Sequence, residues 1–143
     1  MSKKWLGVVS KLHVEKGVQG NFACVCHGKP GPISKLKAGD WLVYYSPTTN
    51  FPEGEKCQEF TGLGQVISGE VHPIEMGVDF KPYGIDMLYK KVNTVSIAEL
   101  KHALSFTQLR SWGMRLRAGL IEITDEDFNL IQAAMLADNK STV

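Results

Sequence analysis

Short apolar segments, separated by glycine, proline and charged residues, most constrain the fold of this chain. Each is rich in β-branched or aromatic residues and is five to nine residues long, which is typical of β-strands rather than helices. The predicted strands cover residues 5–9, 21–26, 41–46, 60–68, 85–92 and 119–123. Gly62 and Gly64 lie inside one of them, and an interior glycine often marks a bulge or a close approach to the backbone.

Helix signals are clearest near the end of the chain. Ser96 and Glu99 form a capping box, which predicts a helix running to about Leu104. Thr124 precedes three acidic residues that suit the positive end of a helix dipole, and this second helix is expected to stop near Asn139. A single helical turn is expected at 33–38.

Many short strands with helices added late predict an α+β fold, a small mixed barrel with peripheral helices. The length of 143 residues fits one domain spanning 1–143. The glycine pair at 62–64 lacks the third glycine and the following helix of a dinucleotide-binding motif. Two irregular stretches, 47–59 and 69–84, are long enough to be functional loops.

Composition places the chain among ordinary globular proteins, with 43% hydrophobic and 22% charged residues. The apolar run from Trp5 to Val9 is too short for a signal peptide or a membrane span. Three cysteines, two of them one residue apart, make a poor disulfide framework and favour a reducing compartment. We therefore expect a cytoplasmic protein without membrane association.

The net charge of +1 conceals an uneven distribution. Residues 1–40 carry seven lysines and two acids, and residues 90–118 carry six lysines or arginines and one acid. If the two basic segments fold onto one face, they form a patch that follows phosphates. The alternative is ordinary surface charge.

The segment GNFACVCHGKPGP, residues 20–32, has three interpretations, of which the first is a metal site. Cys24, Cys26, His27 and Cys57 offer the atoms that zinc prefers. However, cysteines two apart on a strand do not match the spacing of zinc knuckles. We expect neither a metal nor another cofactor.

A reactive cysteine is the second interpretation, and it needs a base that the sequence cannot place nearby. A cysteine on a strand is commonly a small buried hydrophobe. The third is a rigid, amide-rich loop in which Lys29 and the glycines grip an anionic or polar ligand. The ligand loop is favoured, with a plain structural turn as its alternative.

Several motifs in order along residues 4–136 resemble the EVE domain family. They are Trp5-Leu6-Gly7-Val8-Val9-Ser10, Cys26-His27-Gly28-Lys29, Gly39-Asp40, Val43-Tyr44-Tyr45-Ser46-Pro47, Phe60-Thr61 with Gly64, Arg117-Ala118-Gly119, Glu122-Ile123 and Asp127-Phe128. The resemblance implies a PUA-like pseudo-barrel of five to six strands with flanking helices, related to YTH, ASCH and PUA domains. It also implies a non-enzymatic module that binds RNA or DNA and reads a modified base, with modified cytosine favoured.

Carried onto this sequence, the resemblance implies a pocket at one end of the barrel, with aromatic rings for stacking and polar groups for the base edge. The residues expected to form it are Trp5, Ser10, Phe22, His27, Gly28, Tyr45, Ser46, Pro47, Phe80 and Tyr83. Trp5 either lines its floor or belongs to the core.

Cations are expected to hold the phosphates of the bound strand. They are Lys11, Lys29, Arg110, Arg115 and Arg117, and a solvated surface role is the alternative for each. Relatives often carry an arginine pair after a proline–aromatic motif, but Gly84 and Ile85 follow Pro82-Tyr83 in this chain. If those arginines contact phosphate or base in the relatives, this chain either has lost the contact or makes it through Lys81.

Two other functions compete with the base reader. The same pocket can bind a metabolite or a free nucleoside, in which case a surrounding strand adds no affinity. An enzyme acting through Cys26 and His27 is the third possibility, and it requires a thiol with a low pKa.

Overall fold

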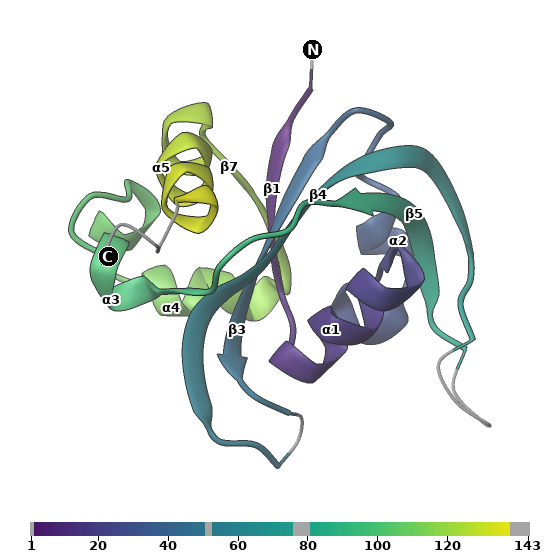
Figure 1. Ribbon diagram of the computed structural model, residues 1–143, viewed down its shortest axis with the longest axis horizontal. Coiled ribbons are helices and arrows are strands. Elements are labelled where there is room, and N and C mark those ends of the chain that lie inside the picture. Colours follow the sequence, from purple (N-terminus) through teal and green to yellow (C-terminus); the bar gives the residue numbers. More distant parts are fainter. Residues whose placement is uncertain (1, 51–52, 76–80, 138–143) are drawn as a thin grey trace.

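The computed structural model describes residues 2–50, 53–75 and 81–137, which form a strongly curved sheet with helices on both sides (Figure 1). Among these residues the sheet has seven strands in the order β2-β5-β4-β3-β1-β7, and β6 pairs with β4. The strands are β1 (Lys4–Val8), β2 (Phe22–Ala23), β3 (Trp41–Thr48), β4 (Lys56–Pro73), β5 (Tyr83–Tyr89), β6 (Val95–Ser96) and β7 (Leu120–Ile123). The mixed α+β architecture predicted from the sequence is confirmed.

The helices fall into two groups (Figure 1). On one side lie α1 (Lys11–Gly20) and α2 (Pro30–Ile33), and on the other α3 (Ile97–Leu100), α4 (Trp112–Arg115) and α5 (Asp125–Leu136). Three short 3-10 turns complete the elements, η1 (Cys26–Gly28), η2 (Phe106–Gln108) and η3 (Leu116–Ala118).

The central strands are apolar on both faces because each face meets its own core. β1 pairs parallel with β3 and antiparallel with β7, and β3 pairs antiparallel with β4. Leu6, Val43 and Tyr45 face the core shared with α5, whereas Leu42 and Tyr44 face the core shared with α1 and α2. This two-sided burial explains why the strand sequences read as continuous apolar runs.

Glycine 62 allows helix α1 to approach the sheet. Tyr44 pairs across the sheet with Gly7 on one side and Gly62 on the other. A Cβ on Gly62 would lie 2.8 Å from Val14 Cγ1 of α1, and a Cβ on Gly7 would lie 3.0 Å from the Tyr44 ring. The close approach predicted for Gly62 is therefore confirmed.

Several expected boundaries differ. Strand 21–26 is only β2, because the backbone turns into η1 at Cys26. The loops predicted at 47–59 and 69–84 are shorter, since β4 extends from 56 to 73 and pairs with both neighbours. The helical turn expected at 33–38 lies earlier, at α2.

Helix caps behave as the sequence predicts, although one helix is shorter than expected. The Ser96 and Glu99 capping box is present, but α3 ends at Leu100 rather than at Leu104. The Thr124 hydroxyl accepts a hydrogen bond from the Asp127 amide and begins α5. The stop expected near Asn139 lies outside the described residues.

Candidate functional site

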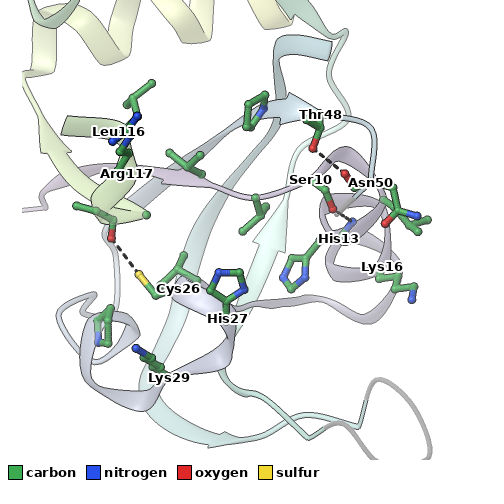
Figure 2. Close-up of a pocket in the computed structure, with 18 residues that line it drawn as sticks. Ser10, His13, Lys16, Cys26, His27, Lys29, Thr48, Asn50, Leu116 and Arg117 are labelled. Atoms are coloured by element: carbon green, nitrogen blue, oxygen red, sulfur yellow. Dashed lines mark hydrogen bonds between the residues drawn. The ribbon is translucent and has the colours of Figure 1, made fainter. Parts of the chain in front are cut away.

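A pocket of about 700 Å³ opens where β1 and β3 end, a volume typical of small-molecule sites (Figure 2). Its walls come from the start of α1, from η1, from the end of β3 and from the η3 loop. The lining residues are Val8, Val9, Ser10, Leu12, His13, Lys16, Val25, Cys26, His27, Lys29, Pro32, Pro47, Thr48, Asn50, Leu116, Arg117, Ala118 and Gly119.

The wall at η1 is built from a left-handed backbone. Cys26, His27 and Gly28 have φ values of 52°, 59° and 81°, a region that residues other than glycine seldom occupy. A Cβ on Gly28 would collide with Pro82, so this turn is packed against the sheet edge. Strained backbone of this kind is found at binding sites, and here it presents the His27 ring to the pocket.

Hydrogen bonds fix this wall to its surroundings. The Tyr44 hydroxyl donates to the Cys24 carbonyl at 2.9 Å, just before η1. The Cys26 thiol donates to the Ala118 carbonyl at 3.2 Å and joins η1 to the η3 loop (Figure 2). Gly119 is part of the same contact, because a Cβ there would lie 2.7 Å from Cys26 Sγ.

Helix α1 supplies the opposite wall and a histidine that sequence reasoning missed. The Ser10 side chain caps the helix by accepting a hydrogen bond from the His13 amide at 3.3 Å. Figure 2 shows the rings of His13 and His27 projecting into the pocket from α1 and η1. Burial lowers the pKa of His13, as do Lys16 and His27, against a backbone hydrogen bond with Cys24 that raises it.

The lysine, arginine and carboxylate content of the lining gives the pocket a positive charge. Lys16, Lys29 and Arg117 line the pocket with exposed side chains. No aspartate or glutamate is among the described residues that line it. The site therefore favours an anionic ligand.

Five of the residues expected to bind a base or phosphate line this pocket, namely Ser10, His27, Pro47, Lys29 and Arg117. The structure brings them together from four separate segments. His13 and Lys16 join them from α1, a helix that the sequence reasoning did not foresee because two glycines interrupt its pattern. Ser10 as the N-cap and Asn21 in a left-handed C-cap were the available signals.

The expected aromatic residues lie elsewhere. Trp5 is buried at the opposite end of β1, where its indole nitrogen donates to Asp40. Tyr45 packs edge-on against Phe60 in the core shared with α5, and Phe22 is buried in a small cluster with Cys24. Trp5 is separated from the pocket by the length of β1, whereas the rings of Tyr45 and Phe22 pack into buried clusters, and the described lining includes no Phe, Tyr or Trp.

Other expected site residues also fall outside the lining. Ser46 is buried and bonded to the Thr61 hydroxyl at 2.7 Å, and Gly28 is buried beneath Pro82. Tyr83 is partly exposed at the start of β5, and Phe80 lies outside the described residues. Arg110 and Arg115 are exposed and Lys11 is half-buried, and all three lie outside the lining.

The metal and thiol interpretations gain no support from the geometry. No group of three or more His, Cys, Asp or Glu side chains is placed to hold a metal ion among the described residues. Burial raises the pKa of Cys24 to about 12 and also raises the pKa values of Cys26 and Cys57. Thiols with raised pKa values are poor nucleophiles at neutral pH.

The curved mixed sheet, flanked by helices and with a pocket at the end of its central strands, defines an α+β fold of the PUA-like class. The family model for the EVE domain matches residues 3–134, and the chain belongs to this family. No helix in the described ranges has the length and apolar character needed to cross a membrane.

Relatives match over nearly the full chain. The UPF0310 protein YdcG of Bacillus subtilis is 42% identical over 132 residues, covering 92% of this chain and 90% of its own. A UPF0310 protein of Mesorhizobium japonicum is 44% identical over 138 residues, covering 94% and 93%.

Solved structures share the fold at low sequence identity. Human THYN1, in complex with 5-methylcytosine-containing DNA, is 14% identical with a TM-score of 0.57, covering 92% of this chain and 96% of its own. Protein Atu2648 of Agrobacterium tumefaciens is 18% identical with a TM-score of 0.56, covering 96% of each chain.

Proposed function

We propose that this protein is a non-enzymatic module that binds nucleic acid and accepts one modified base in the pocket between α1, η1 and the η3 loop. The observation that carries the proposal is the cationic pocket, in which Lys16, Lys29 and Arg117 surround a space of small-molecule size. Membership of the EVE family and the likeness to THYN1, which was solved with 5-methylcytosine-containing DNA, support the same class of ligand.

Each lining group has a chemical role in this proposal. The cations hold phosphates near a base turned out of its strand, because such a base carries its backbone to the rim of the pocket. Ser10 and the two histidines offer hydrogen bonds to the base edge, and Val9 and Pro47 offer apolar contacts to its faces. A modified cytosine remains the favoured base.

The test is a titration of labelled single- and double-stranded oligonucleotides carrying one cytosine, 5-methylcytosine, adenine or N6-methyladenine at two salt concentrations. We expect salt-sensitive binding with a preference for one modified base. Lys29→Ala and Arg117→Ala should each weaken binding and lower the salt slope by about one. Lys91→Ala is the matched control, since it removes an exposed lysine outside the lining.

Binding that is absent for every oligonucleotide, or equally affected by Lys29→Ala and Lys91→Ala, would contradict the proposal.

A free nucleotide is the second candidate ligand. Lys16, Lys29 and Arg117 all line one space, which suits an anionic small molecule. Nucleoside monophosphates that bind as tightly as the matching oligonucleotide would favour this candidate, because a strand reader gains affinity from neighbouring phosphates.

A further inference from the structure

Beside the pocket, the helical segment 112–118 carries an exposed apolar side chain. The segment consists of α4 and η3, which follow each other without a break. Trp112 packs against the core shared with α5, so the segment is held to the body of the protein. Met114, two residues later, is 63% exposed. A single exposed apolar side chain is ordinary, and the interest of this one lies in its position and surroundings.

The helical geometry connects Met114 to the pocket. Side chains three and four residues apart lie on the same face of a helical segment. Met114 therefore shares a face with Arg117 and Ala118, both of which line the pocket. Met114 itself is outside the lining. An apolar side chain thus stands next to the pocket and remains free to contact something other than the bound base.

The surface around Met114 is basic. Arg110, Arg115 and Arg117 are exposed, and none of them makes an ion pair or a side-chain hydrogen bond with another described residue. The sequence holds no aspartate or glutamate from 100 to 121. Lys101 adds a further cation, with its Nζ 5.6 Å from the centroid of the Trp112 ring. Positive charge that continues from the pocket along this segment suits a phosphate backbone.

We propose that Met114 is a wedge that fills the space left by a base turned out of a double helix, while Arg110 and Arg115 bind phosphates of the same duplex. The inference rests on the proposed function of the pocket and adds that the nucleic acid is double-stranded. Turning a base out costs unpairing and unstacking free energy, and an apolar side chain inserted into the stack offsets part of that cost. A single strand has no paired stack, so it leaves no such space to fill.

The first experiment compares duplex with single strand. The oligonucleotide that binds best in the base panel is titrated alone and annealed to its complement. Met114→Ser should weaken duplex binding on the order of tenfold and single-strand binding by about twofold or less. Met114→Leu keeps an apolar side chain and should retain duplex affinity. Leu88→Ser is the matched control, because Leu88 is 62% exposed on β5 and outside the pocket lining.

The second experiment tests the basic surface. Arg110→Ala and Arg115→Ala should each weaken duplex binding and lower the salt slope by about one. Met114→Ser should leave the salt slope unchanged, because it removes no charge. Lys91→Ala is the control for the loss of an exposed cation elsewhere.

The outcomes separate the two proposals. If no oligonucleotide binds, the proposed function fails and this inference fails with it. If single strands bind in a way that depends on Lys29 and Arg117 but duplexes do not bind, the inference alone is wrong. It is also wrong if Met114→Ser weakens both forms equally or neither, or if both Arg110→Ala and Arg115→Ala leave the salt slope unchanged. Thermal unfolding checks each variant, and Met114→Ala replaces Met114→Ser should that variant not fold.

Discussion

The buried Asp40 carboxylate links the turn before β3 to the start of β1. Its carboxylate accepts hydrogen bonds from the Lys3 amide at 2.9 Å, the Lys37 amide at 3.0 Å and the Trp5 indole at 3.0 Å. Burial by itself would raise the pKa of this carboxyl, but the hydrogen bonds and the charge of Lys3 lower it below its ordinary value. The ionised form therefore stabilises the fold.

Replacing this carboxylate should destabilise the protein in a pH-dependent way. Asp40→Asn places an amide hydrogen against one of three donors and should lower the free energy of unfolding by about 2 kcal/mol at neutral pH. The folded pKa is lowered, so the stability is present above the ordinary aspartate pKa and is lost as pH falls through the folded value. Urea unfolding between pH 7 and pH 2 measures it.

Glu15→Gln, at an exposed position of α1, is the control and should change little. A difference between wild type and Asp40→Asn that stays constant down to pH 2 would contradict the assignment.

Helix α1 packs closely on strand β4 because Gly62 of the strand has no side chain. Val14 packs over Gly62, and the same helix carries Ser10, His13 and Lys16 to the pocket. The spacing between helix and sheet therefore sets the position of one pocket wall.

Adding a methyl group to that contact should disturb both stability and binding. Gly62→Ala places a Cβ 2.8 Å from Val14 Cγ1 and should cost about 1–3 kcal/mol, since the buried Val14 side chain and its helix must shift. Gly113→Ala is the control, because nothing lies within 4 Å of its Cβ and alanine favours a helix. Thermal unfolding of both variants makes the comparison.

Equal melting temperatures for the two glycine variants would show that α1 does not depend on this close approach.

In the whole molecule, β1 and β3 are shared by two hydrophobic cores. Leu6 and Val43 belong to the core with α5, whereas Leu42 and Tyr44 on the same strands belong to the core with α1. Unfolding of β1 and β3 would therefore disrupt both cores at once.

The two cores should consequently unfold in one transition. Leu104→Ala in the first core and Ile33→Ala in the second should each cost about 2–5 kcal/mol and lower the midpoint while keeping a single transition. Circular dichroism and tryptophan fluorescence should give the same midpoint for each variant. Two separated transitions in either variant would mean that the cores unfold independently.

Local patterns explain which parts of the fold the sequence predicted well. Strands 5–9 and 41–46 were found because two-sided burial makes them continuously apolar, and Ser96 and Thr124 were found because capping uses residues close in sequence. Helix α1 was missed because Gly17 and Gly20 weaken its pattern, although Gly17 is needed where the helix meets the Phe22 carbonyl.

For the pocket, the sequence by itself identified the lining residues of the loops. Tertiary structure decided which other side chains lie beside them. His27 and Lys29 were recognisable from local glycine and proline chemistry, and Arg117 from its place in the motif order. Which rings turn inward depends on strand alternation within the assembled sheet, which buries Tyr45 and Trp5 in the cores. His13 meets η1 through tertiary packing and not through local sequence. The contact forms only when burial of both cores fixes helix α1 on the sheet.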